Sequence, residues 1–154
     1  MMVGGNASDL ERVQPVLQTM ASRIVHMGAI GAGQSTKAVN QIMAAGINQA
    51  VSEALAFGLA QGLPVDSVIA VIAGGAAGNW FLQHRGPTMI QGHFQPGFKL
   101  ALHNKDLKIC KAMAENSGVP IPIVDMTLND YQALMAQGYG DEDISTLFRL
   151  KRPE

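Results

Sequence analysis

The chain has 154 residues, 47% of them hydrophobic and 15% charged, and its formal net charge at pH 7 is −1. This length is enough to bury one substantial core, and a charge so close to zero argues against a nucleic-acid partner held by electrostatics. The single cysteine, Cys110, excludes an internal disulfide and suits a reducing cytoplasm.

A short strand, helix and strand are predicted at the N-terminus. Residues 1–5 have the character of a strand end, and Ser8-Asp-Leu-Glu11 is a capping box that would open a helix to about Met20. Arg23–His26 is predicted as a second strand. Two strands do not make an independent sheet, so this β-α-β segment is expected to be a minor part of the fold.

A long helix is predicted from Ala32 to Gln61, a proline-free stretch that would span roughly 45 Å. Lys37 and Glu53 are its only charged residues, so most of its surface should be covered by other protein. Polar residues interrupt every window long enough to cross a bilayer. We therefore expect the central helix of a mainly all-α bundle, and no membrane partner.

The first turns of this helix carry a polar cluster of Lys37, Asn40 and Gln41. Residues three and four apart share a helix face. The positive end of the helix dipole and burial both disfavour a charged ammonium, which would make Lys37 a usable general acid or base. The alternative is that Lys37 simply reaches water from the first turns.

A short helix should begin near Pro64 and end at Gly74-Gly75. The glycine-rich turn from there to Trp80 is either a cradle of backbone N–H groups for a carboxylate or a plain turn between helices. Arg85-Gly-Pro87 and Gln95-Pro-Gly97 are expected to bracket a shorter segment.

The next helix is predicted over residues 98–116, with an apolar stripe interrupted by Lys105 and Asp106. The stripe is formed by Phe98, Leu102, Ile109 and Met113. Charges in such a stripe rarely lack a role, although a charge boundary without a ligand is the alternative. Two terminal helices, Val124–Gly138 and Glu142–Leu150, should follow.

The histidines are scattered and lack the spacing of a metal site, so no metal cofactor is expected. They are His26, His84, His93 and His103. His103 is predicted to lie at the surface or an interface.

Three separate motifs carry a resemblance to a known family. They are Gly31-x-Gly33-x-x-x-Lys37-x-x-Asn40, Gly74-Gly-Ala-Ala-Gly-Asn-Trp80, and Pro96-Gly-Phe98 leading to Leu102-His-Asn-Lys105-Asp106-Leu107. Together they resemble the 3-hydroxyisobutyrate dehydrogenase family of β-hydroxyacid dehydrogenases.

The resemblance implies hydride transfer between NAD or NADP and a small 3-hydroxy acid or its semialdehyde. Lys37 matches the catalytic lysine of the family. Asn40, Gln41, Gly78 and Asn79 would bind substrate. Phe98, Lys105 and Asp106 would approach the cofactor.

A dinucleotide-binding Gly-x-Gly-x-x-Gly turn is absent from the sequence, and Gly28-x-x-Gly31-x-Gly33 has the wrong spacing. Residues 1–28 are therefore expected to be a remnant of a Rossmann domain. Residues 29–154 should form an all-helical domain that resembles the C-terminal domain of 6-phosphogluconate dehydrogenase. A chain lacking most of the cofactor domain should be a poor enzyme alone.

The N-terminus lacks the features of a signal peptide, which predicts a cytoplasmic protein. The resemblance implies a homodimer or homotetramer. The competing hypothesis is a helical oligomerisation or interaction module without activity, because small residues along the long helix would allow close helix approach.

Overall fold

The computed structural model describes residues 1–152. It divides into two compact units, one formed by Met1–Gln41 and the other beginning at Ile42. Helix α2 (Ala32–Ala60) starts in the first unit and continues into the second. The bounds of α2 confirm the long helix predicted from the proline-free stretch.

The first unit contains β1 (Met2–Gly4), α1 (Ala7–Leu17) and β2 (Val25–Gly28). The two strands are parallel, with Met2 opposite Val25. This confirms the predicted β-α-β segment. The capping box is wrong, however, because α1 begins after Asn6 and Ser8 already lies inside its first turn.

Backbone contact between β1 and the start of α2 explains two glycines of the first unit. A Cβ on Gly33 would lie 2.7 Å from the Met2 carbonyl oxygen, and a Cβ on Gly4 would lie 2.6 Å from that of Ala29. These distances are too short for any side chain. Part of the glycine pattern before Lys37 therefore serves the packing of a strand against a helix.

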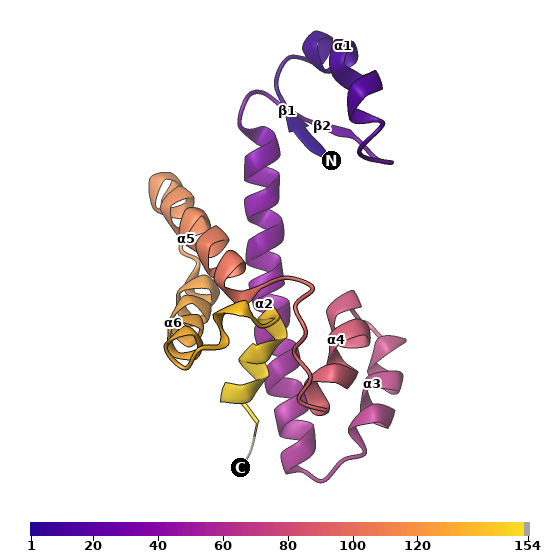
Figure 1. The fold of residues 1–154 in the computed structure, drawn as a ribbon, viewed down its shortest axis with the longest axis vertical. Helices are drawn as coiled ribbons and strands as arrows, with labels where there is room; N and C mark the ends of the chain where they lie inside the picture. Colours follow the sequence, from indigo (N-terminus) through magenta and orange to yellow (C-terminus); the bar gives the residue numbers. More distant parts are fainter. Residues whose placement is uncertain (153–154) are drawn as a thin grey trace. The chain divides into compact units, whose positions relative to one another are not determined.

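The second unit is helical and is built around the remainder of α2 (Figure 1). Its other elements are α3 (Val65–Ala73), α4 (Trp80–Ile90), α5 (Leu100–Ser117), α6 (Pro122–Ala136), and the 3-10 helices η1 (Tyr139–Asp141) and η2 (Ile144–Leu150). Helices α3 and α4 form one contacting pair and α5 and α6 another. The mainly all-α architecture around one long helix is thus confirmed.

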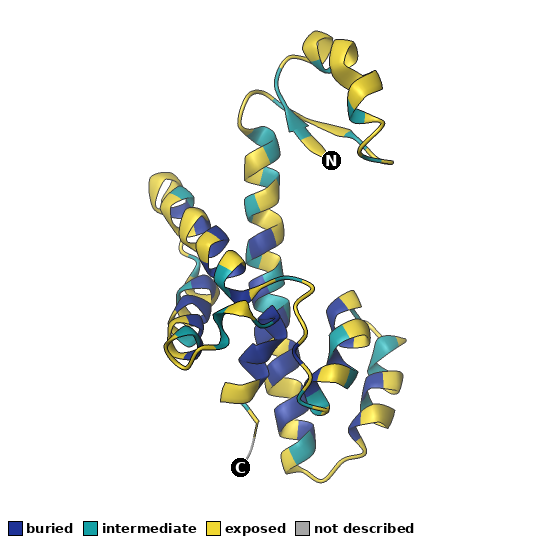
Figure 2. Ribbon diagram, in the orientation of Figure 1, coloured by how far each residue is buried: buried dark blue, intermediate teal, exposed yellow. Residues whose placement is uncertain are grey.

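Figure 2 shows buried residues concentrated on the second half of α2 and on the inner faces of its neighbours. By length and composition α2 could cross a membrane. Its buried polar residues nevertheless find protein partners: the Asn48 amide donates to the Ile144 carbonyl at 2.8 Å, and the Gln49 amide to Asp130 Oδ2 at 2.8 Å. Such partners favour a core helix.

The structure corrects two predicted elements of the second unit. Arg85-Gly-Pro87 does not end a segment, because α4 continues through Pro87 to Ile90. The helix continues although a proline beyond the first turn lacks its own N–H donor and crowds the carbonyl four residues earlier. The last predicted helix is a 3-10 helix rather than an α-helix.

Candidate functional site

The polar cluster at the start of α2 combines exposed and buried side chains. Lys37 and Asn40 are exposed, whereas Gln41 is buried. The Asn40 amide donates to Gln41 Oε1 at 3.1 Å, which fixes the two carboxamides relative to each other. Within the described chain Lys37 therefore does not sit in the dry surroundings that the sequence led us to expect, and its catalytic role remains a prediction.

The glycine-rich segment forms a tight turn between α3 and α4. A Cβ on Gly78 would lie 2.3 Å from the Ala73 carbonyl oxygen, so only glycine fits. The Asn79 side chain caps α4 by accepting from the Leu82 N–H at 2.9 Å, and its amide donates to the Ala77 carbonyl at 3.1 Å. Both ends of this carboxamide thus serve the turn, and the substrate-binding role of Gly78 and Asn79 stays a prediction.

Helix α5 presents a different face to the core than the sequence predicted. Leu102 and Ile109 are 50% and 53% exposed, so the predicted apolar stripe is wrong as a core face. The buried face instead includes polar side chains, namely those of His103, Asn104 and Asp106. Hydropathy assigns such residues to the surface, although here they lie inside.

Lys105 lies on the exposed face of α5, and its side chain is 63% exposed. Its ammonium is 3.1 Å from Oδ1 of the largely buried Asp106. Phe98, which precedes the helix, is half-buried against the core, and its ring centroid lies 5.3 Å from that of His103. The structure therefore pairs Lys105 with Asp106, whereas Phe98 packs beside His103 on the buried side of α5.

A buried carboxylate that was not predicted from the sequence, that of Asp143, binds the backbone just before α5. Asp143 is 2% exposed and forms a two-pronged ion pair with Arg85, at 2.7 Å from Nε and 3.1 Å from Nη2. It also accepts the N–H groups of Gly97, Phe98 and Ser145, each at 3.0 Å. Its position just before η2 was the one available signal, because aspartate is a favoured N-cap residue.

These donors stabilise the ionised form of the Asp143 carboxyl group. Burial alone would raise the pKa of its carboxyl group, but the Arg85 guanidinium and the N–H groups of Phe98 and Ser145 outweigh burial and hold the pKa below its usual range. The Arg85 guanidinium in turn lies over the rings of Trp80 and Phe81, 5.0 and 5.3 Å from their centroids. Asp143 is therefore an ionised acceptor at neutral pH.

A second buried polar network connects α2, α5 and α6. His103 is fully buried, which corrects its predicted surface position, and its Nδ1 lies 3.0 Å from the Tyr131 hydroxyl. The Asn48 amide donates to the same hydroxyl at 3.2 Å. Burial raises the pKa of Tyr131, so its hydroxyl stays neutral. Hydrogen bonding here compensates for placing polar groups inside.

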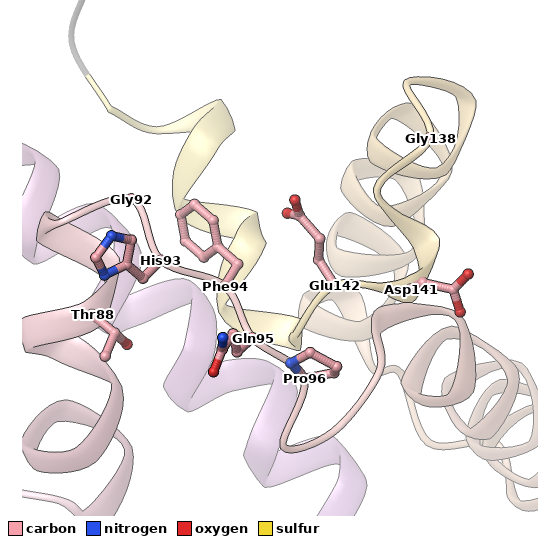
Figure 3. A pocket seen from close by; sticks show the side chains of 9 residues that line it. All are labelled: Thr88, Gly92, His93, Phe94, Gln95, Pro96, Gly138, Asp141 and Glu142. Carbon is pink, nitrogen blue, oxygen red and sulfur yellow. The ribbon is translucent and has the colours of Figure 1, made fainter.

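A surface groove of about 700 Å³ lies between the end of α4 and the C-terminal segment (Figure 3). Thr88 and His93 line one side, and Asp141 and Glu142 line the other. None of the site residues predicted from the sequence lines it. Within residues 1–152, no three metal-ligating side chains gather closely enough to hold an ion.

Comparison with protein families matches residues 31–151 to the family described as NAD-binding of NADP-dependent 3-hydroxyisobutyrate dehydrogenase. The matched range contains every site residue predicted above.

Several proteins named as oxidoreductases or reductases are similar over nearly the whole chain. An uncharacterized oxidoreductase of Bacillus subtilis is 35% identical over 97% of this chain and 52% of its own length. The 2-hydroxy-3-oxopropionate reductase of Escherichia coli is 35% identical over 96% of this chain and 50% of its own. The chain thus spans about half the length of these relatives.

Solved structures also resemble nearly the whole of this chain over about half of their own length. The 3-hydroxyisobutyrate dehydrogenase of Mycobacterium tuberculosis, determined with L-serine, matches with a TM-score of 0.88 and 34% identity. The match covers 99% of this chain and 54% of that one.

Proposed function

The chain belongs to the 3-hydroxyisobutyrate dehydrogenase family, and from this we propose that it is the helical half of an NAD(P)-dependent 3-hydroxyacid dehydrogenase. The reaction would interconvert a small 3-hydroxy acid and its semialdehyde. The family match over residues 31–151, which includes both lysine motifs, is the observation that carries this proposal.

Lys37 is proposed as the group that moves the proton. Its neutral amine would take the hydroxyl proton of the substrate as the carbon-bound hydrogen leaves as hydride, and the resulting ammonium would return a proton to the carbonyl in reduction. The paired carboxamides of Asn40 and Gln41, linked at 3.1 Å, would orient the substrate beside it. Gly78 and Asn79 are proposed to contact the acid group.

The exposed face of α5 fits a dinucleotide chemically. It presents the Lys105 ammonium between the exposed side chains of Leu102 and Ile109, and a dinucleotide offers anionic phosphates and flat apolar rings. Bound NAD or NADP supplies the hydride acceptor or donor. Phe98 and Lys105 would orient the dinucleotide, and Asp106 would hold the Lys105 ammonium at 3.1 Å.

The remaining parts of the proposal concern assembly. Because the chain spans half of its relatives, most of the dinucleotide-binding surface would come from residues outside this chain, and residues 1–28 would be the end of that Rossmann domain. We expect the chain alone to be inactive, to form a homodimer or homotetramer, and to reside in the cytoplasm.

The test joins this chain to the nucleotide-binding half of the Bacillus subtilis relative and measures NAD(P)-linked oxidation of small 3-hydroxy acids. Lys37→Ala should reduce turnover about 10²- to 10⁴-fold, the usual contribution of general acid-base catalysis. Lys108→Ala is the control, because Lys108 is an exposed lysine to which no role is assigned. Equal turnover in both folded variants would contradict the catalytic assignment.

A binding measurement tests whether the dinucleotide is held mainly by residues outside this chain. Calorimetric titration of the chain alone with NADH or NADPH should show no tight binding. Micromolar affinity would contradict the proposal that the dinucleotide is held mainly by residues outside the chain.

A further inference from the structure

The segment between α4 and α5 has no helix or strand of its own, yet its backbone is held along most of its length. The Asp143 N–H donates to the Phe94 carbonyl at 3.0 Å, the Ile144 N–H to that of Phe98 at 3.0 Å, and the Leu100 N–H to that of Glu142 at 2.9 Å. Together these bonds pair residues 94–100 with residues 142–144 at the start of η2.

The Asp143 carboxylate completes this arrangement from the side. One oxygen, Oδ2, accepts hydrogen bonds from the consecutive N–H groups of Gly97 and Phe98. The same carboxylate forms the ion pair with Arg85 of α4. We call Arg85, Asp143 and the Gly97-Phe98 backbone the Asp143 clamp. Three segments distant in sequence therefore meet at one buried charge.

Steric fit around Gly97 shows how closely the clamp is packed. A Cβ at this position would lie 2.8 Å from Arg85 Nη2 and 3.5 Å from Asp143 Oδ2. Glycine thus lets the guanidinium and the carboxylate approach the turn together. The close packing of the turn against the ion pair therefore depends on glycine at position 97.

Net stabilisation is a weak explanation for such a buried pair. Removing two charges from water costs several kcal/mol per ion, and well-packed apolar residues of similar volume often stabilise a protein as well or better. What a charged, two-pronged pair offers in addition is a defined geometry. Here that geometry is applied to the two residues that lead into α5.

We propose that the Asp143 clamp is a positioning device that sets the orientation of Phe98 and the start of α5, and through the rigid helix that of Lys105, for contact with the dinucleotide. Arg85 and Asp143 themselves are positioning residues and touch no reactant. This inference rests on the function proposed above.

The experiment uses the joined enzyme described under the proposed function and compares Asp143→Asn with Asp141→Asn. Asp141 is the matched control, because it lies two residues away and its carboxylate pairs with Lys99 in a largely exposed ion pair. Asp143→Asn should raise KM for the dinucleotide about tenfold or more, since small misplacements of binding groups weaken productive geometry. With saturating dinucleotide, kcat should stay within about twofold of the parent, as should all constants of Asp141→Asn.

Arg85→Lys provides a second variant that keeps the positive charge and loses the planar fork. It should fold and show a dinucleotide KM between those of the parent and Asp143→Asn, and it decides the question if Asp143→Asn does not fold. Circular dichroism and thermal unfolding monitor the fold of each variant.

The outcomes separate the two proposals. An active parent whose variants fold and keep the dinucleotide KM of the parent would overturn the clamp. A parallel loss of kcat and of affinity for both reactants would also overturn it, because that pattern indicates a merely structural role. An inactive parent would overturn the proposed function itself, and this inference with it.

Discussion

Two glycines of the same helix should respond to alanine in opposite ways. Gly33 lies in the first turn of α2, where a Cβ would stand 2.7 Å from the Met2 carbonyl oxygen and 3.1 Å from the Gly4 nitrogen. All of these contacts are with backbone, which cannot rotate away. Gly58 lies near the other end of α2, and a Cβ there would meet no atom within 4 Å.

The magnitudes follow from these contacts. Relieving the clash at Gly33 requires β1 to move by several tenths of an ångström, and overpacking of this kind costs about 1–3 kcal/mol. Alanine at Gly58 should instead stabilise the helix by about 0.5–1 kcal/mol, because it loses less backbone freedom on folding.

Hydrogen exchange measures the first effect where it occurs. The Val25 N–H donates to the Met1 carbonyl and the Gly5 N–H to that of Gly28, both at 2.9 Å, so these amides report opening of the β1–β2 pair. Gly33→Ala should speed their exchange about 5- to 150-fold, and Gly58→Ala should leave it unchanged. Unchanged exchange in Gly33→Ala would refute the argument from backbone contact.

Further predictions concern the second unit and its assembly. Asn48→Ala should lower the free energy of unfolding in urea by about 2–4 kcal/mol, because the buried Tyr131 hydroxyl and Ile144 carbonyl lose a donor. Ser52→Ala should lower it less, because the bond from Ser52 to Asn48 is 3.4 Å long. Equal losses of stability in the two variants would contradict this. The pKa of Asp143 lies below its ordinary value in the folded chain, so its contribution to stability is present above pH about 3.9 and is lost as the pH falls further. Denaturant titrations at pH 7 and pH 3 should show a smaller difference for Asp143→Asn than for the parent, and an identical difference would refute the assignment. Light scattering should show a dimer or tetramer, whereas a monomer at all concentrations would reject the predicted assembly.

The elements with strong local signals were predicted well from the sequence. The proline-free stretch predicted α2 to within a residue of its observed end at Ala60, and Pro64 marked the start of α3 correctly. These signals depend on residues that are neighbours along the chain. The capping box at Ser8 failed because Asn6 offered an equally good helix start two residues earlier.

The contacts that organise the candidate site could not be predicted in the same way. Arg85 and Asp143 are 58 residues apart, and neither has a local pattern that names its partner. Asn48 and Tyr131 are separated by 83 residues. Such pairs become visible only when the helices are packed, because hydropathy carries no information about which buried polar groups satisfy one another.

The exposed apolar side chains of α5 support the proposed placement of the dinucleotide on that face. Periodicity predicted that Leu102 and Ile109 would be buried. The structure instead buries His103 and Asp106 beside apolar neighbours of α5 and leaves Leu102 and Ile109 exposed, with Lys105 between them. Large apolar side chains left exposed on a helix that buries several polar ones conflict with local hydropathy, and such conflicts are expected at functional sites. Since His103 finds a buried hydroxyl partner, the inward face has a structural explanation. On the outward face Lys105 pairs with Asp106, and the proposed dinucleotide, with its anionic groups and flat rings, would cover the exposed Leu102 and Ile109 as well as that ammonium.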